Sequence, residues 1–214
     1  GTDRFHNGRI DDFAAWTTHL TQAEIQKIYN RQRAKYAGTF TSRIIDVGAG
    51  LGAGATWTGF SWIPTLPFSK ELPDAGANET TANYAGLTNS ALMNNIAGLW
   101  HLNGNGTDDS GNGNNGIVIG ATTSDLAALG NRSYDFDGTN DYVDLGDPAA
   151  LEIGGAMSVS AWIKTTQSSG EREIVARWDQ PNNQQSYRLF MSAAGLALFR
   201  ISSDGVNNSV TATG

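Results

Sequence analysis

The stretch MSVSAWIKT, residues 157–165, alternates apolar and polar side chains. Successive side chains of a β-strand point to opposite faces, so Val159, Ala161 and Ile163 share one face of an extended chain. Ser158, Ser160, Trp162 and Lys164 share the other face. The stretch therefore predicts a strand with one face in a core and the other in water or under a neighbouring element.

Similar short apolar runs surround this strand from residue 98 onward and alternate with turn residues every ~8–12 positions. Asp137-Gly138 and Asp204-Gly205 are typical of tight turns. This spacing predicts an antiparallel β-sandwich or barrel. The other predicted strands are 99–102, 116–119, 133–136, 142–145, 173–178, 187–191 and 196–201.

A strand followed by a helix is predicted near the N-terminus. Residues 8–16 have the character of a strand, and Thr21 and Glu24 have the spacing of a capping box. Ile25, Ile28 and Tyr29 follow at helical spacing, so we expect a helix over about 22–36 that is closed by Gly38.

Between this helix and the repeated strands lies a stretch of different character, residues 38–96. Strand-like pieces at 40–47 and 57–63 flank a Gly/Ala run at 48–55. The run lacks the lysine of a phosphate-binding loop, so it predicts a turning connector. We expect a small, irregular, β-rich unit.

The composition excludes several classes of function. The 214 residues include 14 Lys+Arg and 21 Asp+Glu, a net charge of −7, which argues against nucleic acid as the main partner. No stretch is long and apolar enough to predict a membrane span, and the first 30 residues lack the pattern of a signal peptide. The absence of cysteine removes disulfides and thiolate metal sites.

Three segments together resemble laminin-G-like, concanavalin-A-type jelly-roll modules of bacterial surface proteins. They are GLWHLNGNGTDDSGNGNNG at 98–116, SYDFDGTNDYVDLG at 133–146 and the strand at 157–165. Residues 8–30 resemble the last strand and closing helix of the same kind of module, so the tail precedes the head. The resemblance implies an all-β, concanavalin-A-like jelly-roll sandwich with a β-rich connector and one short capped helix. The implied divisions are 1–37, 38–96 and 97–214.

The resemblance also implies a non-catalytic repeat of a bacterial extracellular or cell-surface protein. In one hypothesis it serves adhesion or fibre assembly, with the first strand completing the sheet of its own chain or of a neighbouring copy. In the alternative it is a calcium-dependent carbohydrate-binding module, which could accompany a polysaccharide-degrading catalytic domain. The expected partners are copies of the same chain or surface glycans.

A calcium site is one interpretation of the acidic loops. The pattern Asp108-x-Ser110-x-Asn112-Gly113 matches the first half of a calcium loop, but Ile119 stands where an EF-hand needs glutamate. The alternative is a Gly/Asn loop whose side chains cap its own backbone. The potential calcium ligands are Asp108, Asp109, Asn112, Asn114, Asp137 and Asp141.

Large aromatic side chains could stack on sugar rings if they lie on wet faces, although in a sandwich such residues more often belong to the core. The candidates for ligand binding are Trp162, Trp178, Tyr142 and Tyr187.

Enzymatic chemistry has little support in the sequence. Asp135 with Asp137 and Glu171 with Glu173 form carboxylate pairs, but the three alternating acids of the jelly-roll glucanases that this fold resembles are missing. His101 lies in a strand-like run without the spacing of a catalytic triad or metal cluster, so a hydrogen-bonded structural role is expected.

Overall fold

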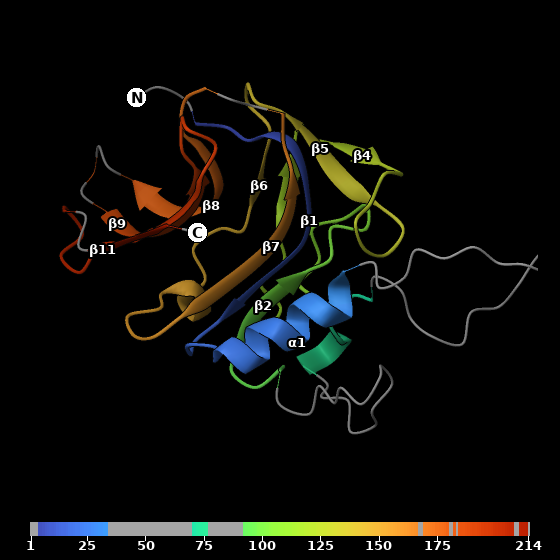
Figure 1. The fold of residues 1–214 in the computed structure, drawn as a ribbon, viewed down its shortest axis with the longest axis horizontal. Helices are drawn as coiled ribbons and strands as arrows, with labels where there is room; N and C mark the ends of the chain where they lie inside the picture. Colours follow the sequence, from blue (N-terminus) through green and yellow to red (C-terminus); the bar gives the residue numbers. More distant parts are fainter. Residues whose placement is uncertain are drawn as a thin grey trace, which may run out of the picture.

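A computed structural model describes residues 4–33, 70–76, 92–166, 169–179, 182, 184–207 and 210–213. Within these residues the structure consists of antiparallel strands and one α-helix, which confirms the predicted all-β class (Figure 1). In chain order the elements are β1 (Asn7–Trp16), α1 (Gln22–Gln32), η1 (Asp74–Gly76), β2 (Ile96–Trp100), β3 (Ile117–Ile119), β4 (Thr122–Ser124), β5 (Ser133–Asp137), β6 (Tyr142–Asp144), η2 (Ala149–Leu151), β7 (Ser158–Lys164), β8 (Arg172–Asp179), β9 (Gln184–Met191), β10 (Ala197–Ile201) and β11 (Val210–Thr213).

The strand β1 lies inside the larger sheet. It pairs with β7 along one edge, and along the other edge it pairs with β5 and then with β2. β4 extends this sheet beyond β5. Figure 1 shows β1 and β7 running side by side through the centre of the molecule. The first strand therefore completes a sheet whose other strands all come from after residue 95, within the same chain.

The second sheet has the strand order β11-β10-β9-β8, and β3 pairs with β6 in a small ribbon. In Figure 1 the β8–β11 sheet, in orange and red, lies to one side of β1 and β7. All eight strands predicted from residue 98 onward are present, with ends that differ by a few residues. β4 and β11 were not predicted, because each is short and rich in threonine rather than apolar residues.

Apolar side chains fill two cores, one on each face of the larger sheet. The inner core contains Ile10, Phe13, Trp100 and Phe136. Val159, Ala161 and Ile163 pack against it, as the alternation in β7 predicts. The outer core lies under α1 and contains Ala14, Trp16, Ile28, Leu72, Leu92, Met93 and Leu99.

A β-bulge shifts the alternation of side chains in β1. Ile10 and Phe13 both belong to the inner core although they are three residues apart. The register with β7 shifts between Asp11 and Ala14, and Asp12 has a φ of 47°. An extra residue in one strand turns the following side chains to the other face. The bulge thus places Asp12 on the side of α1, where it is fully buried.

The helix begins as predicted and ends earlier. The capping box is present, with Thr21 accepting a hydrogen bond from the Glu24 backbone and Glu24 accepting one from the Thr21 backbone. The predicted end near residue 36 was wrong, because Arg33 is extended and the helix stops at Gln32. The predicted apolar face was also partly wrong, since Ile25 is 55% exposed and Tyr29 is 47% exposed. The buried face consists of Ile28, Arg31 and Gln32.

Two pieces of the expected connector pack against the sandwich. The Lys70 backbone donates to the Arg31 carbonyl over 3.2 Å, and Ala75 donates to the Asp109 carbonyl over 2.6 Å. Leu92 and Met93 belong to the outer core. The predicted strands at 40–47 and 57–63, the Gly/Ala run between them and Gly38 lie outside the described residues.

Candidate functional site

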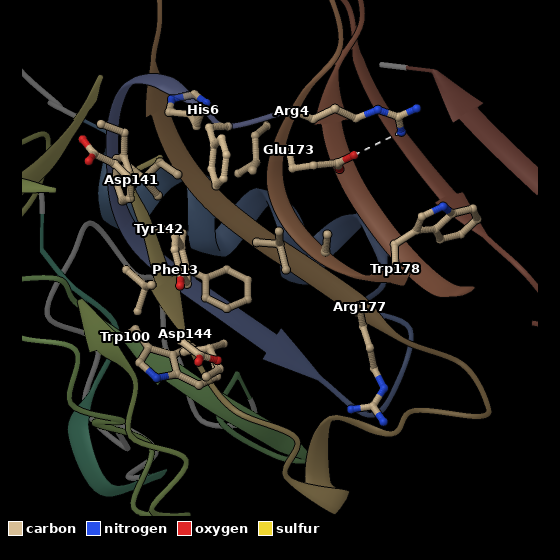
Figure 2. Close-up of a pocket in the computed structure, with 18 of the residues that line it drawn as sticks. Arg4, His6, Phe13, Trp100, Asp141, Tyr142, Asp144, Glu173, Arg177 and Trp178 are labelled. Carbon is tan, nitrogen blue, oxygen red and sulfur yellow. Dashed lines mark ion pairs between the residues drawn. The ribbon is translucent and has the colours of Figure 1, made fainter. Parts of the chain in front are cut away.

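A cavity of about 730 Å³ lies between the larger sheet and the β8–β9 pair (Figure 2). Figure 2 shows Phe13, Trp100 and Tyr142 on one side, from β1, β2 and β6, and Arg177 and Trp178 of β8 on the other. A volume of this size falls in the ~300–1,000 Å³ range of ligand pockets. The cavity is therefore large enough for a small organic ligand.

Three of the four aromatic residues predicted to bind a ligand line this cavity, namely Tyr142, Trp178 and Tyr187. Tyr142 is 42% exposed and lies against the ring of Phe5, with 6.1 Å between centroids. Tyr187 is buried, and its hydroxyl donates to the Leu151 carbonyl over 3.2 Å. Tyr142 thus offers an accessible ring, whereas Tyr187 serves as a fixed wall.

Two further rings in the cavity were not identified as ligand-binding residues. Phe13 and Trp100 stack with centroids 4.9 Å apart and an angle of 12° between their planes. The Trp100 indole N–H donates to the Asn114 carbonyl over 3.0 Å. Both residues belong to apolar strand runs, so the sequence alone could not distinguish cavity lining from ordinary core.

Charged side chains at the cavity are held by ion pairs. Arg177 contacts Asp147 at 2.5 Å and Glu152 at 2.9 Å. Glu173 contacts Arg188 at 2.7 Å and Arg4 at 3.5 Å, and Glu171 contacts the same two arginines. The predicted carboxylate pair of Glu171, just before β8, and Glu173, within β8, is thus engaged with two cations.

Some polar atoms at the cavity have no hydrogen-bond partner among the described residues. They are both ring nitrogens of His6 and the Oε2 atom of Glu173. Burial lowers the pKa of His6 to about 4, so its ring is neutral at pH 7. Burial also raises the pKa of Glu173, against the opposing effect of Arg188 and Arg4. Buried polar atoms are normally paired, so these atoms are exceptions among the described residues.

Trp162, the fourth predicted aromatic residue, lies apart from this cavity. It lines a hollow of about 320 Å³ with Arg9, Asp11, Ser133 and Lys164, next to the 126–128 loop. Its indole N–H donates to Gln32 of α1 over 2.9 Å, and its ring stacks on Tyr29 with centroids 6.4 Å apart. The structure therefore divides the four aromatic residues between two sites.

The predicted calcium loop around Asp108 is organised by its own backbone. Asp108 Oδ1 accepts hydrogen bonds from the amides of Leu99 and Ser110, and Oδ2 accepts from the amide of Asn114. Ser110 Oγ accepts from the Asn112 amide over 3.2 Å. Amide N–H groups surround the carboxylate oxygens that a cation would need, so the geometry at Asp108 favours the self-capping interpretation.

The other predicted calcium ligands have separate roles. Asn112 and Asn114 donate through their side-chain amides to the carbonyl of Ala97. The Asp109 amide donates to the Leu99 carbonyl. Asp141 accepts from the Asp137 amide over 2.8 Å, in the connection between β5 and β6. In the part of the chain that the structure describes, no group of three or more His, Asp or Glu side chains could hold a metal ion. Calcium binding by these residues stays a prediction.

A buried polar network that the sequence did not predict lies beside α1. His101 Nδ1 is 2.5 Å from Asp12 Oδ1, and Nε2 is 3.1 Å from Asp74. Gln32 donates to the other oxygen of Asp12. Burial alone would lower the pKa of His101, but the hydrogen bond and charge of Asp12 raise it to about 9. His101 is thus the hydrogen-bonded structural histidine that was expected, and it carries a positive charge at pH 7.

Two antiparallel sheets that face each other across an apolar core define this protein as an antiparallel β-sandwich, an architecture consistent with a concanavalin A-like jelly roll. Residues 137–214 match the family model described as the concanavalin A-like lectin/glucanases superfamily, a laminin-G-like domain. This match confirms the predicted resemblance for the part of the chain that contains β6 to β11. No curated protein and no solved structure matches the chain. None of the described helices has the length and apolar character that crossing a membrane requires.

Proposed function

We propose that this chain is a non-catalytic carbohydrate-binding domain of an extracellular adhesion protein, and that the cavity between the sheets is its binding site. The observation that carries the proposal is that Tyr142, Trp178 and Tyr187 line one cavity whose edge also holds charged side chains. A sugar ring has an apolar C–H face and polar hydroxyl edges. Aromatic walls suit the face, and groups such as Arg177 and Glu173 suit the edges.

The unpaired polar atoms support the same proposal. His6 and Glu173 each present atoms without a hydrogen-bond partner among the described residues. A ligand with several hydroxyl groups can donate to the glutamate oxygen and both donate to and accept from a neutral imidazole. A purely apolar ligand would leave these atoms unpaired, which costs about 1–3 kcal/mol for each.

The test is a binding measurement with substitutions at the accessible rings. Wild-type chain and the variants Tyr142→Ala and Trp178→Ala are titrated calorimetrically with a panel of neutral and acidic oligosaccharides. We expect each variant to lose about tenfold in affinity, equivalent to ~1.4 kcal/mol of lost contact. Leu196→Ala is the control, because this exposed apolar residue lines neither the cavity nor the hollow at Trp162. Unchanged binding in both cavity variants would refute the assignment.

A second function, fibre assembly by strand complementation, is favoured by the position of β1. This strand precedes α1 in the sequence. In the sheet, however, it lies between β7 on one side and β2 and β5 on the other. The same contacts form if β1 comes from a neighbouring copy. A head-to-tail exchange of this kind does not close on itself and so builds a fibre.

Cysteine trapping distinguishes exchange between copies from pairing within one chain. Arg9 and Lys164 are direct register partners, and the natural chain has no cysteine. Chains carrying only R9C are refolded together with chains carrying only K164C, then oxidised in calcium and in chelator. Exchange predicts disulfide-linked dimers. An exposed control, Leu196→Cys, should not cross-link to R9C. Absence of the specific dimer would refute strand exchange.

A further inference from the structure

The hollow at Trp162 lies on the outer face of the larger sheet, opposite the cavity. Ile10 and Ile163 pack into the inner core, so their neighbours Arg9, Asp11, Trp162 and Lys164 point to the other face. Arg9 pairs in register with Lys164, and Asp11 pairs with Trp162. Two cations, one acid and one aromatic ring on the paired strands β1 and β7 thus line the hollow.

The loop around residues 126–129, which is bonded to Arg9 and Asp11, forms a wall of the hollow. Arg9 donates to the Leu126 carbonyl over 2.8 Å, and Asp11 accepts from the amides of Ala128 and Leu129 over 2.7 and 2.9 Å. Leu126 itself is 69% exposed and lines the hollow. The apolar wall at Leu126 and the indole ring of Trp162 are suited to a ligand with a flat, partly apolar ring.

The charges in the hollow leave one cation without a partner. Arg9 is paired with Asp135 at 3.4 Å. Lys164 is exposed, and no ion pair to it is found among the described residues. Its ammonium group therefore stands at the rim of the hollow as a binding group for an anion.

A second observation points to a ligand at the same place. Asp11 is only 3% exposed, and its Oδ1 atom has no hydrogen-bond partner in the part of the chain that is described. Burial raises the pKa of Asp11 to about 6, despite the two amides that it accepts from. A hydroxyl group at the base of the hollow would complete the hydrogen bonding of this carboxyl.

We infer that the hollow is a second binding site, specific for an acidic sugar of the hexuronate class. The pyranose ring lies between Trp162 and the Leu126 wall, a hydroxyl reaches Asp11, and the carboxylate meets Lys164. The site goes beyond the proposed function in ligand class and location, and it shares with that proposal only the premise that the domain binds carbohydrate. A volume of about 320 Å³ is enough for one sugar unit of a chain.

The test compares two forms of one oligosaccharide. Wild-type chain is titrated with α-1,4-linked tetragalacturonate and with its fully methyl-esterified, neutral form, in 50 mM salt. We expect the anionic form to bind at least tenfold more tightly, and K164A to remove that preference. K27A is the control, because Lys27 lies on α1 and does not line the hollow. Acetate at the same carboxylate concentration should not compete.

Failure of this inference is distinguishable from failure of the proposed function. Equal binding of the two forms, an unchanged preference in K164A, competition by acetate or no binding at all would overturn the uronate site. Loss of neutral-sugar binding in Trp178→Ala tests the cavity between the sheets instead. A chain that binds neutral sugars through the cavity and shows no uronate preference supports the first proposal and refutes the second.

Discussion

Gly8 fixes how closely β1 and β7 approach each other. Its φ is +133°, and a Cβ atom there would lie 2.2 Å from the Lys164 carbonyl oxygen. That oxygen is backbone and cannot move without opening the sheet. We expect Gly8→Ala to lower the free energy of unfolding by about 3 kcal/mol or more, as measured by urea denaturation.

Gly154→Ala is the control for this prediction, because nothing lies within 4 Å of the added methyl group and its φ is not positive. We expect a change within about 0.5 kcal/mol there. Equal unfolding midpoints for the two variants would show that β1 does not pair with β7 at this position.

For single residues, the sequence indicates which chemical groups are present, but it does not indicate how they are arranged in space. The spacing of Asp108, Ser110 and Asn112 fits both a calcium loop and a self-capping turn, because both need oxygen atoms at alternate positions. Only the direction of the amides of Leu99 and Asn114 separates the two. The aromatic candidates behave similarly, since nothing in the pattern separates Trp162 from Trp178.

Among the elements, α1 is held at its first turn by the Thr21–Glu24 capping box. Thr21→Ala removes the acceptor for the Glu24 amide, so we expect a loss of about 1 kcal/mol in unfolding free energy. Thermal unfolding followed by circular dichroism measures it. Gln22→Ala, at the exposed neighbouring position, should have little effect. Equal melting temperatures for Thr21→Ala and the wild-type chain would show that the cap does not stabilise the fold.

The elements themselves are largely predictable because local signals define them. Alternation predicted β7, and the capping box predicted the start of α1. The bulge at Asp12, by contrast, depends on β7 being its neighbour, and the end of α1 depends on Gln32 bonding to Asp12 and Trp162. These contacts join residues far apart in the chain, so no local pattern contains them.

Across the whole molecule, the Asp12–His101–Asp74 network joins β1, the 70–76 segment and the residue that follows β2. The pKa of His101 is raised from 6.5 to about 9, so the folded chain binds a proton that the unfolded chain releases above pH 6.5. This stabilisation is fully present below pH 6.5 and is lost as pH rises through about 9. We expect the unfolding free energy to fall by about 1–3 kcal/mol across this range.

Urea denaturation at intervals from pH 6.5 to 9.5 measures that fall. His101→Gln keeps a polar side chain but removes the titrating group, so its stability should depend much less on pH in the same range. His19→Gln is the control, because His19 is exposed on the connection before α1 and should leave the slope unchanged. A slope that persists in His101→Gln would assign it to other groups.

The central position of β1 also determines the order in which the molecule can be built. Ile10 pairs with Ile163, so β1 has no complete partner until β7, more than 140 residues later in the sequence, has been synthesised. Contacts between such distant parts of a chain form slowly. Until then Phe13 and Trp16, both buried in the finished fold, are open to other nascent chains. The late arrival of β7 therefore makes the interval before β1 is paired the stage at which aggregation competes with folding.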